Sequence, residues 1–360
     1  MRIRECRKME NRVEEAEKLF EVLPRETLGF FPTPFYRLDH LSAELGINLY
    51  IKRDDFTGMN LFGGNKIRKL EYLLGEAKAS GCDSVITYGA TQSNHAMETA
   101  AACRRCGLNP ILYLTAVVKP DEQDIRANLL LDQVLGAEIH IVEIGDGETE
   151  EEAEERSFRM GAAHAARLTA AGHGCLDIPM GGANVTGSVG FAHGFLELQH
   201  QLDGAGIHAD YIFHATGTGG TMAGLAAGRR LTESDTKIVS ITVSHKDETY
   251  LRRVEQLAND VLVLLKAPQR VEWQRDLCMD TGYYAPGYEQ PNEAAGEAIR
   301  LLARTEGLFV DPVYTGKAFA GLLDYVRTGK IAAGSNVVFW HTGGATALFA
   351  EKEILGNILS

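Results

Sequence analysis

Short apolar runs alternate with longer stretches of helical periodicity along most of this chain. The runs that predict buried strands are residues 83–89, 109–116, 138–144, 210–217, 237–244 and 336–344. Between them, apolar residues recur at helical spacing in residues 93–107, 124–137, 221–230 and 292–307. Strands that alternate with helices of this length predict βαβ units and mostly parallel sheets, an α/β fold.

The number of predicted strands exceeds what one small sheet needs, so we expect two open parallel-sheet domains. In such sheets ligands bind beyond the carboxyl ends of the strands. The turns that lead from a strand into a helix are therefore the places to look for chemistry.

Composition and charge narrow the class of protein. Of the 360 residues 45% are hydrophobic and 24% charged, as in an ordinary globular protein. The net charge of −13 argues against a nucleic-acid partner and against docking on anionic membranes. No apolar run is long enough to cross a bilayer, and the charged first twenty residues lack the apolar stretch of a signal peptide. We expect a cytoplasmic protein.

Two conspicuous motifs have ordinary structural explanations. The acidic run at residues 145–159 predicts the solvated first turns of a helix, where carboxylates suit the positive end of the helix dipole. Cys103 and Cys106 form a C-x-x-C at the end of a predicted helix, with no second pair and no suitably spaced histidines. We therefore interpret them as helix cysteines, not as a metal or redox site.

The stretch LFGGNKIRKLEYLL, residues 61–74, places a lysine where a helix disfavours one. Gly63, Gly64 and Asn65 predict a turn and an N-cap, so that a helix begins near Lys66. The first turn of a helix favours anions, and Arg68 and Lys69, which we expect either to lower the pKa of their neighbour or simply to face solvent, add positive charge close by. The cationic form of Lys66 is then disfavoured and its amine is available as a nucleophile, as in a Schiff-base lysine. The alternatives are an anion-binding lysine or a surface lysine without a function.

A glycine-rich turn follows the predicted strand at 210–217. Glycines let backbone N–H groups approach an anion, and the following helix supplies a favourable field. We interpret the turn as a phosphate cradle; a tight turn without a ligand and a dinucleotide site, with Asp247 after the next strand, stay open. The predicted cradle comprises Thr216, Gly217, Thr218, Gly219, Gly220 and Thr221.

A third strand-to-helix turn reads TYGATQSNHAMETA, residues 87–100. Ser93 or Asn94 would cap the helix in any protein of this fold. The functional interpretation is that Ser93, Asn94, His95 and the free N–H groups of the helix face a carboxylate or a ring oxygen.

A Schiff-base lysine and a cradle for one phosphate together suggest pyridoxal phosphate, which has one aldehyde and one phosphate. The motifs GGNKIRKLEYLL, SNH, TGTGGT, DPVYTGKAFAGL and HTGG, in this order, resemble the D-cysteine desulfhydrase and 1-aminocyclopropane-1-carboxylate (ACC) deaminase family. The resemblance extends from about residue 31 to the C-terminus. It implies the tryptophan synthase β-like fold of fold type II enzymes. It also implies a small domain, residues 61–177, inserted into a large cofactor-binding domain of residues 1–60 and 178–360, and a homodimer.

The resemblance also assigns roles to individual residues. Lys66 matches the lysine that holds the cofactor, and residues 216–221 match its phosphate loop. Asn94 matches the residue beside the ring oxygen, and Ser93 the serine near the substrate carboxylate. Tyr288 and Tyr314 match two active-site tyrosines. A further match, Thr342 in HTGG, is to the hydroxyl that faces the pyridine nitrogen.

Two positions divide the family. ACC deaminases resemble one another in a glutamate after the tyrosine of DPVY and a leucine after the histidine of HTGG, where this chain has Thr315 and Thr342. A hydroxyl at the ring nitrogen makes the cofactor a weaker electron sink, which favours elimination of a good leaving group. The resemblance thus implies α,β-elimination of D-cysteine to pyruvate, sulfide and ammonia. ACC deaminase and L-cysteate sulfo-lyase are the near alternatives, and a dinucleotide-binding protein or a non-catalytic cofactor carrier the distant ones.

Overall fold

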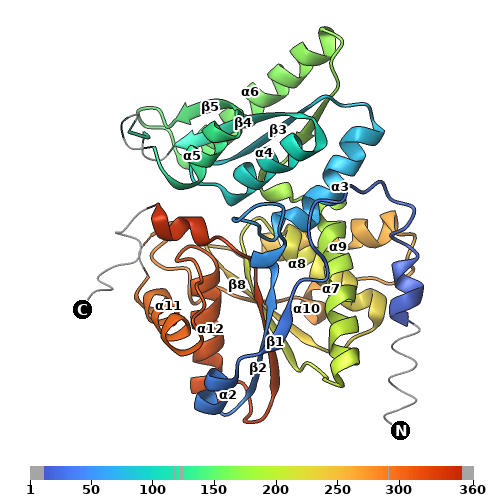
Figure 1. The fold of residues 1–360 in the computed structure, drawn as a ribbon, viewed down its shortest axis with the longest axis vertical. Helices are drawn as coiled ribbons and strands as arrows, with labels where there is room; N and C mark the ends of the chain where they lie inside the picture. Colours follow the sequence, from blue (N-terminus) through green and yellow to red (C-terminus); the bar gives the residue numbers. More distant parts are fainter. Residues whose placement is uncertain (1–11, 117–118, 122, 124, 291, 351–360) are drawn as a thin grey trace.

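A computed structural model describes residues 12–116, 119–121, 123, 125–290 and 292–350. It has two sheets, one above the other in Figure 1. No helix in these ranges has the length and apolarity that a bilayer crossing needs.

The larger sheet has six strands and is parallel except at one edge, where β1 runs antiparallel to β2. The carboxyl ends of its central strands therefore meet at one edge, where His341 pairs with Arg53 and Thr216 with Thr242. In spatial order the strands are β1 (Phe35–Arg37), β2 (Asn48–Arg53), β10 (Asn336–His341), β7 (Tyr211–Thr216), β8 (Lys237–Thr242) and β9 (Cys278–Asp280).

The smaller sheet has four strands, all parallel. In spatial order they are β5 (Glu138–Glu143), β4 (Asn109–Ala116), β3 (Ser84–Ala90) and β6 (Cys175–Ile178). Both sheets occur as the strand–helix alternation predicted, and the α/β fold is confirmed. The domain boundaries after residues 60 and 177 stay a prediction.

Helices cover the faces of both sheets, and every helix that the sequence pattern predicted is present. The acidic run begins α6 as expected, with Thr149 and Glu152 forming a capping box. The helices are α2 (Asp39–Leu45), α3 (Lys66–Ala79), α4 (Asn94–Cys106), α5 (Ala127–Val134), α6 (Glu150–Ala170), α7 (Val185–Ala205), α8 (Gly220–Thr232), α9 (Glu248–Leu264), α10 (Trp273–Asp276), α11 (Glu293–Glu306) and α12 (Thr315–Arg327).

The helix α3 lies between the two sheets in Figure 1 and packs closely against α7. A Cβ atom at Gly190 of α7 would lie 2.1 Å from the carbonyl oxygen of Arg68 in α3. Only glycine therefore permits this approach of the two helix backbones. The first turn of α3, which carries Lys66, is held in place by this contact.

The residues before β1 pack on the chain's own core. Residues 12–17 are helical, and Val13 and Phe20 are buried in the same apolar cluster as Val189 of α7 and Val254 of α9. The buried face of this N-terminal helix therefore covers α7 and α9 of the same chain.

Candidate active site

Lys66 is the first residue of α3, as the sequence predicted, but the expected cap at Asn65 is wrong. The Asn65 side chain makes no capping hydrogen bond. Its Oδ1 accepts a hydrogen bond from Lys66 Nζ at 3.0 Å, and its Nδ2 donates one to Thr221 Oγ1 at 3.3 Å. The helix start is instead held by Glu98 of α4, whose Oε2 accepts from the N–H of Ile67 at 3.2 Å. Asn65 thus connects Lys66 with the glycine-rich turn after β7.

Burial determines the charge of Lys66. Desolvation lowers the pKa of its ammonium group, and the buried carboxylates of Glu98 and Asp311 oppose that shift. Burial also raises the pKa of Glu98, to about 8. The sequence predicted a lowered lysine pKa because of neighbouring cations; the direction holds, but its main cause is burial.

Gly64 has no side chain, and this allows the carboxyl group of Glu98 to lie close to the backbone before α3. A Cβ atom at Gly64 would lie 2.6 Å from Glu98 Oε1. The carboxylate therefore approaches the turn before α3 as closely as a glycine allows. Since the nearest atoms belong to Glu98, the glycine is needed for a contact within the protein.

Arg68 and Lys69 do not face solvent, which was one of the roles expected for them. Arg68 is 5% exposed and forms ion pairs with Asp54 at 2.7 Å and Glu197 at 2.8 Å. Lys69 is 1% exposed, and its Nζ donates to the carbonyl oxygen of Gly181 at 3.0 Å. Lys69 comes three residues after Lys66 and therefore lies on the same side of α3 as the Lys66 amine.

The glycine-rich turn leads from β7 into α8, in the strand–turn–helix context that the sequence predicted. Gly219 has a φ of +97°, which a side chain would strain. A Cβ atom at Gly220 would lie 2.8 Å from Lys69 Nζ. Thr216 is already engaged, since its hydroxyl lies 2.7 Å from that of Tyr250. The turn therefore joins the N-terminus of a helix, free backbone N–H groups and a buried ammonium group.

This arrangement fits the phosphate group of pyridoxal phosphate. Burial lowers the pKa of Lys69 well below its usual value, and Lys66 lowers it further. No carboxylate within the described residues forms an ion pair with Lys69 at 4.0 Å or less. A bound phosphate would supply the missing counter-charge and accept from the N–H groups of α8. The Asn65 side chain bonds to Thr221 of this turn and to Lys66, and Lys66 would hold the aldehyde carbon of the cofactor.

Ser93 and Asn94 lie where β3 leads into α4. Ser93 caps the helix, its Oγ accepting from the N–H of Ala96 at 3.2 Å, as the structural interpretation held. Asn94 Oδ1 accepts from Asn128 Nδ2 at 2.8 Å and from Thr346 Oγ1 at 3.1 Å. These two donors orient the Asn94 amide so that its NH2 group remains as a donor.

The two predicted tyrosines are in contact. Their hydroxyl oxygens lie 2.6 Å apart, and their rings meet edge to face at 5.8 Å. Burial raises the pKa of both hydroxyls, so each stays protonated at neutral pH. A cavity of about 20 Å³ joins them to one other predicted residue, Asn94; it is lined by Gln92, Asn94, Tyr288, Glu289, Val313, Tyr314, Ala347 and Ala350.

Thr315 is the first residue of α12, and Thr342 directly follows β10. Thr315 is fully buried, and its hydroxyl donates to Asp311 Oδ1 at 2.5 Å. Asp311 also accepts from the N–H groups of Val313, Tyr314 and Thr315, so it caps α12. The carbonyl oxygen of Thr342 accepts from the N–H of Asn65 at 3.0 Å, which brings the HTGG motif beside Lys66.

Sequence reasoning missed three charged residues of this site: Lys69, Glu98 and Asp311. The spacing of Lys66 and Lys69, three residues apart on one helix, was the available signal for Lys69. Glu98 and Asp311 lie in motifs quoted above, but nothing local shows that their carboxylates are buried beside Lys66.

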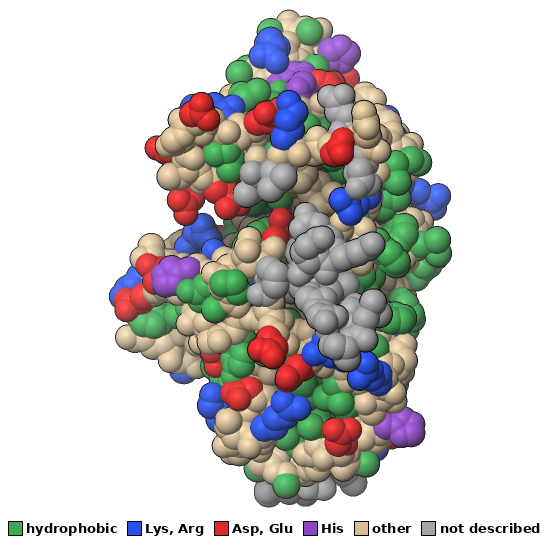
Figure 2. All heavy atoms as spheres, turned by 90° about the vertical axis from the view of Figure 1, so that its left-hand side faces the viewer, with side chains coloured by type: hydrophobic (Ala, Val, Ile, Leu, Met, Phe, Trp, Pro, Cys, Tyr) green, Lys and Arg blue, Asp and Glu red, His purple; other side chains and the backbone are tan. Residues whose placement is uncertain are grey.

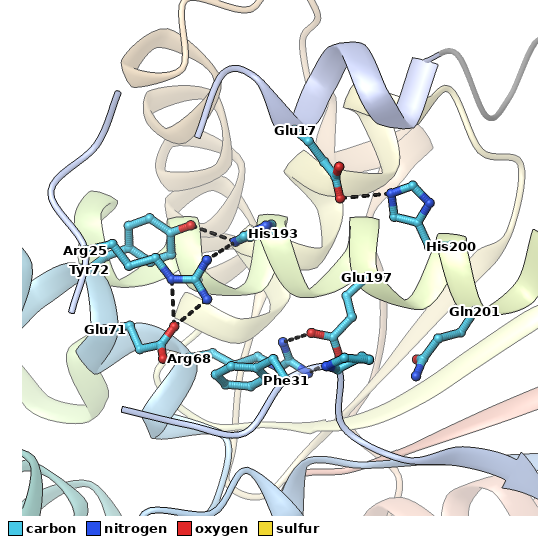
Figure 3. A pocket seen from close by; sticks show the side chains of 12 residues that line it. Glu17, Arg25, Phe31, Arg68, Glu71, Tyr72, His193, Glu197, His200 and Gln201 are labelled. Atoms are coloured by element: carbon cyan, nitrogen blue, oxygen red, sulfur yellow. Dashed lines mark hydrogen bonds and ion pairs between the residues drawn. The ribbon is translucent and has the colours of Figure 1, made fainter. Parts of the chain in front are cut away.

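A larger cavity, of about 520 Å³, lies on the opposite face of α3 (Figure 3). Arg25 reaches into it and binds Glu71 and His193, while Glu17 of the N-terminal helix contacts His200 at 2.8 Å. Arg68 is the residue of α3 that both lines this cavity and pairs with Glu197 of α7. The cavity is thus separated by α3 from Lys66 and the glycine-rich turn.

Comparison with known proteins agrees with this geometry. A family model described as pyridoxal-phosphate dependent enzyme matches residues 26–343. A putative 1-aminocyclopropane-1-carboxylate deaminase of Pyrococcus abyssi is 39% identical over 96% of this chain and 99% of its own length. A D-cysteine desulfhydrase of Serratia proteamaculans is 37% identical over 91% of this chain and 96% of its own length. The crystal structure of an ACC deaminase homologue superposes with a TM-score of 0.83 at 34% sequence identity. The match covers 95% of this chain and 98% of the homologue.

Proposed function

The chain belongs to the family of pyridoxal-phosphate-dependent enzymes, and from this premise we propose that it catalyses α,β-elimination of D-cysteine to pyruvate, sulfide and ammonia. Its relatives include proteins named for D-cysteine desulfhydrase and for ACC deaminase at nearly the same identity, so overall similarity does not choose between the two substrates. The choice has to come from individual positions. The family match leaves no support for the dinucleotide-binding alternative.

The residue at position 315 is the observation that favours D-cysteine over ACC as the substrate. The resemblance places a glutamate here in ACC deaminases, whereas Thr315 is buried and donates its hydroxyl proton to Asp311. A glutamate at this position would add a second carboxylate beside a buried one, which is costly. This chain therefore favours the desulfhydrase pattern of Thr315 and Thr342.

The residues of the chain divide the work of the elimination. Bound pyridoxal phosphate supplies an aldehyde for an amine and a ring that withdraws electrons from the α-carbon of the substrate. Lys66, whose pKa burial lowers, removes the α-proton as a neutral amine. Ser93 and the N-terminus of α4 bind the substrate carboxylate.

The tyrosine pair handles the leaving group. Tyr288 and Tyr314 are protonated and hydrogen-bonded to each other, so one donates a proton to the departing thiolate while the other stabilises the resulting charge. Asn94 donates to the ring oxygen of the cofactor, and residues 216–221 with Lys69 bind its phosphate. A cytoplasmic homodimer remains part of this proposal.

Product analysis tests the substrate. The purified holoenzyme is incubated separately with D-cysteine, L-cysteate and ACC, and sulfide, sulfite and 2-oxobutyrate are measured, with the Lys66→Ala variant as the background. We expect sulfide from D-cysteine at a rate well above that background. Formation of 2-oxobutyrate from ACC without sulfide from D-cysteine would overturn the substrate assignment and leave the cofactor assignment intact.

A further inference from the structure

Three potential metal ligands meet at the edge of the smaller sheet, away from the site described above. Glu138 and His140 are two residues apart on the edge strand β5, so their side chains point to the same face of the sheet. His164 of α6 lies over that face. His140 Nε2 is 2.7 Å and His164 Nδ1 is 3.8 Å from Glu138 Oε1.

The neighbouring strand orients both imidazoles. Tyr113 of β4 pairs with His140 in the sheet, and their rings stack at 4.5 Å with an angle of 11°. The Tyr113 hydroxyl lies 3.1 Å from His164 Nδ1. A single tyrosine therefore restrains both histidine rings, which reduces the conformational freedom that a ligand would otherwise have to remove.

We propose that Glu138, His140 and His164 bind a divalent transition-metal ion, with Zn²⁺ as the best match. Two imidazoles and one carboxylate are a ligand set that zinc accepts, with the remaining position open to water. Within the described part of the chain, these are the only three His, Cys, Asp or Glu side chains whose ligand atoms all lie within 4.8 Å of one another.

The distances require little rearrangement. Ligand atoms on a tetrahedral zinc ion lie roughly 3.3 Å apart, and the two distances to Glu138 lie on either side of that value. An ion that takes Nδ1 of His164 replaces the Tyr113 hydroxyl at that nitrogen, while the stacking of Tyr113 on His140 is kept. The side chains of His164, His140 and Glu138 are 13%, 35% and 52% exposed, so an ion reaches them from solvent.

Figure 2 shows the surface of the molecule on one side. Histidine side chains gather near the upper end of the molecule, over the smaller sheet, among acidic and basic side chains. A bound ion would tie the edge strand β5 to α6. It would therefore stabilise the smaller sheet without touching Lys66.

Calorimetric titration of the chelator-treated holoenzyme with zinc sulfate tests the proposal, with the visible absorbance of the cofactor as the check that each variant is folded. The test variants are His164→Gln and His140→Gln. The matched control is His173→Gln, because His173 Nδ1 also lies 2.7 Å from a carboxylate, that of Asp83, but lacks a third ligand. The cysteines are the same in all these proteins, so differences between them isolate the site.

We expect the wild type and the control to bind one more zinc ion per chain than the test variants, or to bind it at least about tenfold more tightly. Zinc should also raise the thermal midpoint of wild type and control, and not that of the test variants. Equal zinc binding by wild type and both test variants would overturn the proposal, as would an equal loss in the control. If one test variant does not fold, the other decides.

Discussion

The substitution Lys69→Met separates the binding of the cofactor's phosphate from every other contact in the site. Lys69 is buried, its Nζ donates only to the carbonyl oxygen of Gly181 in the described structure, and a Cβ atom on Gly220 would lie 2.8 Å from that nitrogen. We therefore expect its ammonium group to pair with the phosphate. Methionine keeps the length and apolar body of the side chain and removes the charge.

A hydrogen bond to a charged group contributes about 1.5–3 kcal/mol, so the variant should bind pyridoxal phosphate roughly 10- to 150-fold more weakly. Without the phosphate, the desolvation cost of the buried Lys69 amine outweighs its one hydrogen bond, to the carbonyl oxygen of Gly181. The free energy of unfolding of the cofactor-free variant should therefore equal or exceed that of the cofactor-free wild type. Affinity and stability are expected to change in opposite directions.

The assay is reconstitution of the cofactor-free protein, followed by visible absorbance, with pyridoxal phosphate and with pyridoxal, which has the aldehyde but no phosphate. Lys69→Met should weaken the binding of pyridoxal phosphate and leave the binding of pyridoxal nearly unchanged. Lys78→Met is the control, since Lys78 lies on the same helix, 44% exposed, and pairs with Glu26 at the surface. An equal loss for both aldehydes, or no loss for either, would refute the assignment of Lys69 to the phosphate.

Four further outcomes are expected. Lys66→Ala should abolish the visible chromophore and the borohydride-reducible adduct; a variant that keeps both refutes the role of this lysine. Tyr288→Phe removes a partner of Tyr314 and should lower kcat about 10²-fold or more with little change in cofactor absorbance, which steady-state kinetics would show. Arg68→Met leaves the buried carboxylate of Asp54 without its counter-charge, while Glu197 keeps its ion pair with Lys52; the variant should cost about 3–5 kcal/mol in urea unfolding, and a loss below about 1 kcal/mol would contradict the ion-pair argument. Since the pKa of Glu98 is raised to about 8, the folded protein holds a proton there that the unfolded chain releases near pH 4.5; stability should fall as pH rises through that window, and Glu98→Gln should remove this part of the fall.

The sequence predicted the strand–turn–helix units well because their signals are local. Apolar runs, glycines and helical spacing identified β7, the turn after it and α8 without reference to the rest of the chain. The resemblance then directed attention to Lys66, Asn94 and the two tyrosines, and the structure brings Asn94 and the tyrosines to one cavity.

What the sequence could not show depends on partners distant in the chain. Arg68 looks like a surface residue until Asp54 and Glu197, 14 and 129 residues away, are placed against it. Asparagine is a residue type that often caps a helix, as expected of Asn65. The N–H group of Ile67 is nevertheless bound by Glu98, which is 31 residues away. Local propensity cannot distinguish these cases, because tertiary contacts decide which donor each carboxylate meets.

Helix α7 was missed for a related reason. Its residues 185–205 contain four glycines, which a local reading assigns to turns. In the structure these glycines include Gly190, Gly194 and Gly187, whose Cβ atoms would lie 2.1, 3.1 and 2.3 Å from neighbouring atoms. They are needed for packing, and packing is not visible in a short sequence window.

The contact between Gly190 and Arg68 has a consequence for attempts to change the substrate of this enzyme. Libraries that vary Tyr288 and Asn94 alter side chains that line a small cavity and contact other side chains, so many replacements leave the backbone in place. Any larger residue at position 190 would instead push α3 outward and carry Lys66 with it. A mutational scan scored by cofactor absorbance should therefore show intolerance at position 190, on a helix that does not line the cavity beside Tyr288 and Asn94.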